Sequence, residues 1–157
     1  MPEIEKELVA ELKARGLKVS TAESCTGGLA AAMITSVPGA SDVFESGVVT
    51  YSNGAKNTLL GVAAETLDEH GAVSAETAAA MARGARALLT GADIGVSVTG
   101  LAGPTGGEGK PVGLVYVGVA SEKFSRVDEL HLSGDRDAIR AMSARHALSM
   151  ALEAARF

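Results

Sequence analysis

Residues 17–36 read LKVSTAESCTGGLAAAMITS, and this stretch decides the kind of fold. Residues 17–22 have the length and pattern of a short strand, and residues 26–36 have the apolar, alanine-rich pattern of a helix. The Pro-Gly pair at 38–39 then ends that helix. A strand that passes through a glycine turn into a helix is the unit from which α/β proteins are built.

The rest of the chain continues this alternation. Helices are predicted at 3–15, after Ser52 or Asn53, at 64–70, after Ser74 and at 135–155, and strands at 44–51, 93–99, 112–120 and 125–133. The early alternation predicts parallel strands joined by right-handed crossovers, and the last two strands should pair as a hairpin. We therefore expect a single domain over residues 1–157, an α/β fold of the three-layer α/β/α sandwich type with a mixed, mostly parallel central sheet.

The composition limits the classes of function. The formal net charge is −5, and no run of basic residues is longer than two, which argues against nucleic-acid binding. The single cysteine fits a reducing compartment. No run approaches roughly 18 apolar residues, and the first 16 residues lack the layout of a signal peptide. The sequence predicts a cytoplasmic protein that contacts no membrane.

Three segments that follow predicted strands carry the polar and glycine residues of a site. They are TAESCTGG (21–28), TYSNGAK (50–56) and TGLAGPTGG (99–107). In open α/β sheets ligands gather at the carboxyl ends of the strands, where such loops meet. The three segments can therefore build one pocket.

Ser24 stands between a predicted strand and a predicted helix, and two interpretations fit it. In one, Ser24 and Thr26 only cap the helix. In the other, Ser24 attacks a carbonyl group, and the backbone N–H groups of Cys25, Thr26 and Gly27 hold the resulting oxyanion. Cys25 is a rival nucleophile, or else a small buried residue. This segment alone leaves these alternatives open.

A serine hydroxyl needs a base that takes its proton. The three histidines are badly placed for this, near a helix end, on a weak strand and within the last helix: His70, His131 and His146. Lys56 can serve if burial lowers its pKa, and Tyr51 at a strand end can relay a proton. The spacing of Tyr51 and Lys56 fits ordinary surface residues as well.

The third segment is rich in glycine but lacks the GK[ST] ending of a P-loop. Glycines let a backbone approach a phosphate or a ribose closely, and Thr105 and Lys110 could add contacts. The alternative is a tight connecting loop. Arg136, in the GDR stretch before the last helix, either binds a phosphate or is a solvated charge.

The motifs TAESCTGG, VPGASDVFESGVVTYSNGAK, LLGV, HGAVS, VTGLAGPTGG, KPVGLV and GDR resemble, in this order, the CinA C-terminal domain family. The resemblance runs from about residue 5 to residue 155. It implies a three-layer α/β/α fold and hydrolysis of the carboxamide of nicotinamide mononucleotide to nicotinate mononucleotide and ammonia, in pyridine nucleotide salvage. It also implies that the catalytic serine, tyrosine and lysine are Ser24, Tyr51 and Lys56, with no metal and no organic cofactor.

The expected substrate-binding residues follow from the resemblance and from the predicted loops. The turn after Ser24, with help from Thr99 or Gly100, would hold the oxyanion, and the glycine-rich loop and Arg136 would hold the nucleotide. These residues are Cys25, Thr26, Gly27, Thr99, Gly100, Thr105, Gly106 and Arg136.

The chain departs from the family pattern at two places. Gly54 replaces an acidic or bulkier residue, and the loop between GPTGG and KPVG is about one residue short. The pyrophosphatase activity linked with an additional N-terminal domain in many members is not expected, because these 157 residues leave no room for that domain.

Two other classes of function stay open. One is a non-catalytic module that binds a nucleotide. The other is a magnesium-dependent phosphoryl-transfer enzyme, for which Asp93 and Asp135 make no convincing acidic pair. The two apolar faces of the last helix suggest a homo-oligomer, unless the sheet covers the second face.

Overall fold

The fold is organised around a five-stranded sheet with the strand order β2-β1-β3-β4-β5. The computed structural model describes residues 3–157. The strands are β1 (Val19–Glu23), β2 (Phe44–Val49), β3 (Ile94–Gly100), β4 (Leu114–Ala120) and β5 (Ser125–His131). The pairs β1–β2 and β1–β3 are parallel, whereas β3–β4 and β4–β5 are antiparallel. The predicted mixed sheet is confirmed: only β4 opposes the other strands, and the pairings divide evenly between the two kinds.

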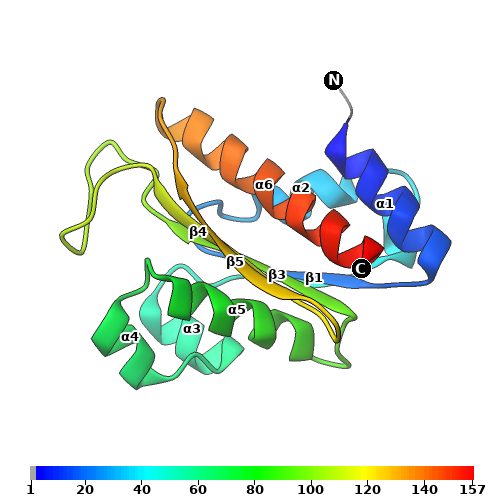
Figure 1. Ribbon diagram of the computed structural model, residues 1–157, viewed down its shortest axis with the longest axis horizontal. Helices are drawn as coiled ribbons and strands as arrows, with labels where there is room; N and C mark the ends of the chain where they lie inside the picture. The colour runs from blue at the N-terminus through cyan, green and yellow to red at the C-terminus, as the bar shows by residue number, and fades with distance from the viewer. Residues whose placement is uncertain (1–2) are drawn as a thin grey trace.

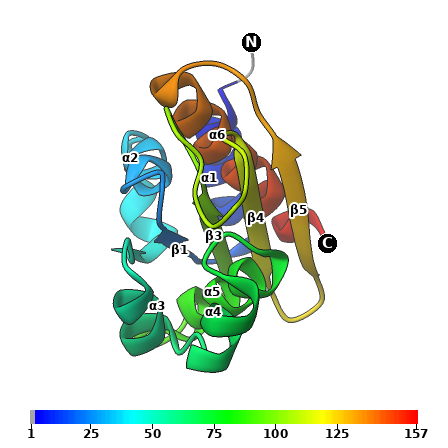
Figure 2. The same cartoon turned by 90° about the vertical axis from the view of Figure 1, so that its left-hand side faces the viewer.

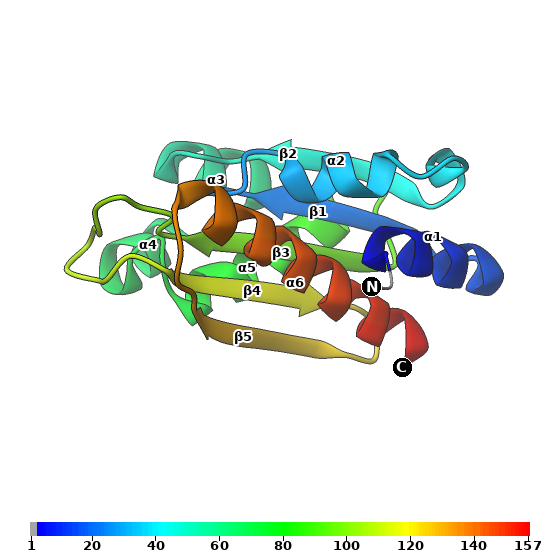
Figure 3. The ribbon, with the colours of Figure 1, turned by 90° about the horizontal axis from the view of Figure 1, so that it is seen from above.

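Two layers of helices enclose this sheet, so the predicted α/β/α sandwich is confirmed (Figure 1). One layer holds α1 (Ile4–Arg15), α2 (Leu29–Thr35) and α6 (Arg136–Arg156). The other holds α3 (Asn53–Leu60), α4 (Ala64–His70) and α5 (Ala75–Ala87). A short 3-10 helix, Ala40–Asp42, leads into β2. In Figure 3 the five strands lie side by side beneath α1, α2 and α6.

The helix after β1 begins later than its composition predicts. It starts at Leu29 rather than near Thr26, because residues 24–28 form turns. Gly27 and Gly28 have φ angles of +60° and +103°, which other residues rarely adopt. These turns place Ser24 to Gly28 at the carboxyl end of β1, outside the helix.

The core is built from small aliphatic residues, in keeping with only 3% aromatic residues. Glycines let α5 pack closely on the sheet: a Cβ atom at Gly95 would lie 2.1 Å from the carbonyl oxygen of Ala82, and one at Gly118 would lie 2.7 Å from that of Ala78. Larger side chains at these strand positions would push α5 away from the sheet.

Both faces of α6 are covered within the chain. The sheet lies against one face, and α1 and α2 pack beside it. Leu148 and Leu152, on the face that suggested a partner subunit, are buried in the same core cluster as Leu8 and Leu12 of α1. The two-sided pattern of α6 therefore has an explanation inside one chain, and the homo-oligomer stays a prediction.

Across residues 3–157, no helix is long and apolar enough to cross a membrane.

One end of the sheet gathers the three segments singled out in the sequence. The parallel strands β1, β2 and β3 all end there, and the β3–β4 loop, residues 101–113, projects beyond the same end (Figures 1 and 2).

Candidate active site

Ser24 directly follows β1 and is nearly buried, with 8% of its surface exposed. Its backbone N–H donates to the carbonyl of Val98 in β3, at 3.0 Å. The preceding residue, Glu23, is buried, and its carboxylate accepts hydrogen bonds from the N–H groups of Ala30 and Ala31 at 2.8 and 3.0 Å. The strand on one side and this carboxylate on the other fix the turn that carries Ser24.

Lys56 brings its amine to Ser24. It belongs to α3, whose first turn is capped by the Ser52 hydroxyl accepting from the Ala55 N–H at 3.0 Å. The Lys56 side chain is 1% exposed, and its Nζ lies 3.0 Å from Ser24 Oγ. The predicted pairing of a serine with a buried lysine is thus present in the geometry.

The surroundings of Lys56 make its amine lose a proton more readily than a solvated lysine does. Nζ donates to the carbonyls of Thr50 at 2.8 Å and Tyr51 at 3.3 Å. No carboxylate within the described residues forms an ion pair with it. Burial lowers the pKa of Lys56, and the smaller electrostatic effects of Cys25 and Glu108 act in the opposite direction without cancelling this shift. A neutral amine has two N–H groups, which match the two carbonyls, and one lone pair, which is left to accept the Ser24 proton.

The turn after Ser24 supplies two free backbone donors. In the chain from residue 3 onward, the N–H groups of Cys25 and Thr26 donate no hydrogen bond to another residue. The N–H of Gly27, the third donor expected from the sequence, instead donates to the Ser24 carbonyl at 3.0 Å. That prediction is wrong for Gly27, because its N–H closes the turn.

Cys25 has the properties of a packing residue. Its side chain is 5% exposed and belongs to the main core cluster. Burial raises the pKa of its thiol to about 11. Because the thiolate is the reactive form, a thiol with this pKa is a poor nucleophile near neutral pH.

Tyr51 lies at the site but contacts Lys56 only through its backbone. Its side chain is 62% exposed, and its hydroxyl accepts a hydrogen bond from Arg136 at 3.1 Å. Within residues 3–157, no hydrogen bond joins this hydroxyl to Ser24 or Lys56. Arg136 also donates to the carbonyl of Gly103. It therefore links Tyr51, which follows β2, to the glycine-rich loop, and it is not a solvated charge.

The glycine-rich loop places its predicted residues at different depths. Thr99 is buried and donates its hydroxyl proton to the Ala72 carbonyl at 2.8 Å, and Gly100 pairs with Val115 in the sheet. Thr105 and Gly106 are exposed on the projecting part of the loop. A Cβ atom at Gly106 would lie 2.2 Å from the Lys110 carbonyl, so this glycine is required by the loop's own packing.

Glu108 and Lys110 fasten this loop to the connection between α4 and α5. The Glu108 carboxylate accepts from the N–H groups of Ala72 and Val73 at 2.9 and 3.1 Å. Lys110 Nζ donates to the carbonyls of His70 and Val73. Lys110 is therefore occupied by protein contacts, and no sequence pattern pointed to the role of Glu108.

Arg140 is another residue that the sequence analysis missed. It donates from Nε to the Cys25 carbonyl at 3.0 Å and from a terminal nitrogen to the Thr26 carbonyl at 3.1 Å. A signal was present, because Arg140 stands one helical turn after Arg136 and so lies on the same side of α6.

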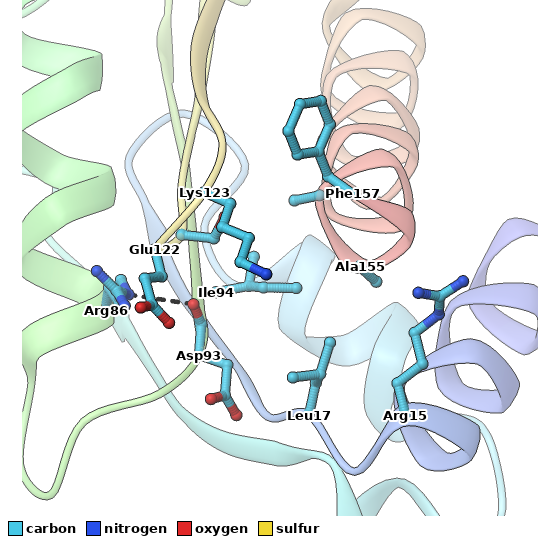
Figure 4. A pocket seen from close by; sticks show the side chains of 11 residues that line it. Arg15, Leu17, Arg86, Asp93, Ile94, Glu122, Lys123, Ala155 and Phe157 are labelled. Atoms are coloured by element: carbon cyan, nitrogen blue, oxygen red, sulfur yellow. Dashed lines mark hydrogen bonds between the residues drawn. The ribbon is translucent and has the colours of Figure 1, made fainter.

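A cavity of about 310 Å³ lies at the other end of β3, where that strand begins (Figure 4). Leu17, Ile94 and Lys123 help to line it, and it shares no lining residue with the Ser24 site. Asp93, one of the two acids considered for a magnesium site, stands here and accepts from the Lys18 N–H at 2.8 Å. The other, Asp135, caps α6 by accepting from the Ala138 N–H.

Fold and site together define a three-layer α/β protein with a buried serine–lysine pair at the carboxyl ends of its parallel strands. The chain belongs to the CinA C-terminal domain family, whose sequence pattern matches residues 1–155. It is 56% identical over 149 residues to a protein named for competence-damage induction from Caldanaerobacter subterraneus, and 53% identical over 146 residues to a CinA-like protein of Kosmotoga olearia. These matches cover 94% and 92% of this chain but only 36% and 35% of those relatives.

Solved structures of similar length share the fold. A competence/damage inducible protein from Agrobacterium tumefaciens is 42% identical with a TM-score of 0.91, and the match covers 100% of this chain and 98% of the other. A CinA superfamily protein from Klebsiella pneumoniae is 37% identical with a TM-score of 0.93, over 98% and 96% of the two chains.

Proposed function

We propose that the protein hydrolyses the carboxamide of nicotinamide mononucleotide to nicotinate mononucleotide and ammonia, with Ser24 as the nucleophile. The observation that carries this proposal is the 3.0 Å contact between Ser24 Oγ and the amine of the buried Lys56. A lysine whose pKa is lowered by burial can act as a general base near neutral pH.

The steps follow from the contacts around Ser24. Neutral Lys56 takes the Ser24 proton while Oγ attacks the carboxamide carbon. The free N–H groups of Cys25 and Thr26 are the donors for the oxyanion. The ammonium of Lys56 then returns its proton to the amide nitrogen, the C–N bond breaks and ammonia leaves. Water, deprotonated by Lys56, cleaves the resulting ester and releases the carboxylate.

The charge distribution near Ser24 suits an anionic substrate. The whole chain carries a formal net charge of −5, yet Arg136 and Arg140 both reach this end of the sheet. Within the described part of the chain, neither arginine forms an ion pair with a carboxylate. The phosphate of a mononucleotide would supply the missing negative charge. In this proposal Arg136, Tyr51 and the exposed Thr105 contact the nucleotide.

Ammonia release from nicotinamide mononucleotide tests the proposal, measured in EDTA for the unmodified protein, Ser24→Ala and Cys25→Ala. We expect Ser24→Ala to lose at least about a thousandfold in kcat and to bind the nucleotide normally, because only the nucleophile is removed. Cys25→Ala is the matched control and should keep its activity. Activity that survives in Ser24→Ala but not in Cys25→Ala would move the nucleophile to the neighbouring residue.

No ammonia from the unmodified protein would overturn the deamidase proposal for this substrate. Normal nucleotide binding in that case would favour a non-catalytic binding module, whereas EDTA-sensitive phosphoryl transfer would favour a magnesium enzyme. The cytoplasmic location and the homo-oligomer expected from the sequence remain predictions.

A further inference from the structure

Arg140 makes the only side-chain contacts, among residues 3–157, to the carbonyls of the turn that follows Ser24. It reaches that turn from α6, across 115 residues of sequence, and donates to two successive carbonyls, those of Cys25 and Thr26. A Cβ atom at Gly27 would lie 3.2 Å from a terminal nitrogen of Arg140, so the glycine keeps the guanidinium close to the backbone.

The planarity of the peptide bond links these carbonyls to the oxyanion donors. In a trans peptide, the C=O of one residue and the N–H of the next point in opposite directions. The Cys25 carbonyl points to Arg140, so the Thr26 N–H in the same peptide points away from Arg140 and stays free. The Thr26–Gly27 peptide follows the same rule. Its carbonyl accepts from Arg140, and its N–H, on the opposite side, donates to the Ser24 carbonyl.

A cation on a carbonyl oxygen also polarises the peptide to which it belongs. Electron density shifts toward the oxygen, and the N–H at the other side of the peptide becomes a stronger donor. The effect is largest where water is excluded, and Cys25 and Thr26 are 5% and 0% exposed. Hydrogen bonds from a charged donor are about twice as strong as neutral ones, which also holds the turn in one orientation.

We propose that Arg140 is a positioning residue for the reaction: it orients and polarises the Cys25–Thr26 peptide so that its N–H stabilises the oxyanion that forms when Ser24 attacks. This inference rests on the proposed function, because it assigns a role within the same site. It differs from a purely structural tie between α6 and the turn, since it predicts a loss in the chemical step that depends on the positive charge.

Two readouts test this role in Arg140→Gln, Arg140→Lys and the control Arg145→Gln, an exposed arginine on the same helix. The first is kcat and KM for ammonia release from nicotinamide mononucleotide. The second is the rate at which a fluorophosphonate probe labels Ser24, which also requires attack by Oγ and stabilisation of a developing oxyanion. Thermal unfolding shows that each variant is folded.

We expect Arg140→Gln to lose about 10- to 100-fold in kcat and in labelling rate, with KM changed less than about threefold; this is less than the roughly 100- to 1,000-fold loss of a whole oxyanion donor, because the Thr26 N–H remains. Arg140→Lys keeps the charge and should retain more of both rates, and Arg145→Gln should match the unmodified protein. Equal losses in the lysine and glutamine variants, or a loss confined to KM or thermal stability, would overturn the proposal.

The two readouts separate this inference from the proposed function. If the unmodified protein releases no ammonia but Ser24 is labelled, the proposed substrate is wrong, and the dependence of labelling on Arg140 still decides the inference. If Ser24 of the unmodified protein is not labelled, the inference is overturned together with the nucleophile on which it depends.

Discussion

The most unusual single residue is Lys56, a lysine buried to 1% exposure with two carbonyls and a serine hydroxyl around its amine. Burial of a charged ammonium is unfavourable, and the group responds by losing its proton more readily. The lowered pKa of Lys56 thus destabilises the folded protein and is also what the proposed general-base role requires. In the proposed mechanism, one side chain couples catalysis to stability.

This coupling predicts a pH dependence of stability. The pKa of Lys56 is about 10.5 when the chain is unfolded and lower when it is folded. Between the two values the unfolded chain binds more protons, so this lysine makes the free energy of unfolding rise with pH, and below the folded pKa its full penalty is present. Urea denaturation of Lys56→Met should therefore show a gain in stability over the unmodified protein that shrinks as pH rises through this window.

The exposed Lys123, replaced by methionine, is the matched control and should show no such trend. Activity of the unmodified protein should rise with pH as Lys56 loses its proton. A stability difference for Lys56→Met that is constant with pH would contradict the buried, neutral amine.

At the scale of elements, the helices α3 and α5 approach each other so closely that only a glycine fits at one contact. A Cβ atom at Gly84 of α5 would lie 2.2 Å from the carbonyl oxygen of Leu60 in α3. Gly54, in the first turn of α3, has open space instead: the nearest atom to its Cβ position is Ser52 Oγ at 3.9 Å. The departure from the family at Gly54 is therefore not imposed by packing within the described residues.

These two helical glycines predict opposite effects of the same substitution. Gly54→Ala should stabilise the protein by about 0.5–1 kcal/mol, since alanine restricts the unfolded chain and meets no clash. Gly84→Ala should destabilise it by about 1–3 kcal/mol, since α5 must move away from α3. Chemical denaturation measures both. A Gly84→Ala variant that is as stable as the unmodified protein would show that the α3–α5 contact is looser than described, and a destabilised Gly54→Ala variant would contradict the open space at Gly54.

At the scale of the whole molecule, the β3–β4 loop links the two helix layers across the end of the sheet. Arg136 of α6 donates to its Gly103 carbonyl, while Glu108 and Lys110 attach it to the connection before α5. Burial alone would raise the pKa of Glu108, but hydrogen bonds from Val73 and Ala72 and the nearby Lys110 together lower it. The ionised carboxylate therefore strengthens an attachment that Lys110 and Arg136 also make.

Neutralising Glu108 should weaken this attachment. In Glu108→Gln, a weaker acceptor faces the N–H groups of Ala72 and Val73, so we expect their hydrogen exchange to quicken by about tenfold, the equivalent of one hydrogen bond to a charged group. In the unmodified protein, the protection factor of these two N–H groups, which corrects for the pH dependence of exchange itself, should fall as pH drops through the lowered pKa of Glu108. Glu122→Gln, in the exposed turn between β4 and β5, should leave it unchanged.

Much of this fold was predictable from local sequence patterns. The strand that ends before Ser24 and the alternating helices gave the sandwich, and the rule that parallel strands end at one edge brought Ser24 and Lys56 together. The starts of the helices after Ser52 and Ser74 were predictable from N-capping preferences. Each serine hydroxyl accepts a hydrogen bond from the backbone N–H of the residue three positions later in the chain.

Side-chain directions at the ends of elements were not predictable in this way. The hydroxyl of Tyr51 meets Arg136, which is 85 residues away, and Arg140 meets the turn after Ser24, 114 and 115 residues away. Such contacts depend on how α6 is rotated over the sheet, which is set by packing with α1 and the strands rather than by neighbours in the sequence. The Gly27 N–H was assigned to an oxyanion from the sequence, whereas in the structure it donates to the Ser24 carbonyl. This hydrogen bond depends on the φ angles of the turn, and the presence of glycines indicates that a turn is possible without determining those angles.

The antiparallel placement of β4 has a consequence for how this protein can change. A hairpin between neighbouring strands needs only two linking residues, but β3 and β4 are joined by residues 101–113. The loop is thus far longer than the sheet demands, and residues 104–106 are exposed between the attachments at Gly103 and Glu108. We expect changes of length or sequence between these attachments to leave the sheet and the serine–lysine pair intact. Under the proposed function, selectivity for one amide over another can therefore evolve, or be engineered, in this loop without changing Ser24 or Lys56.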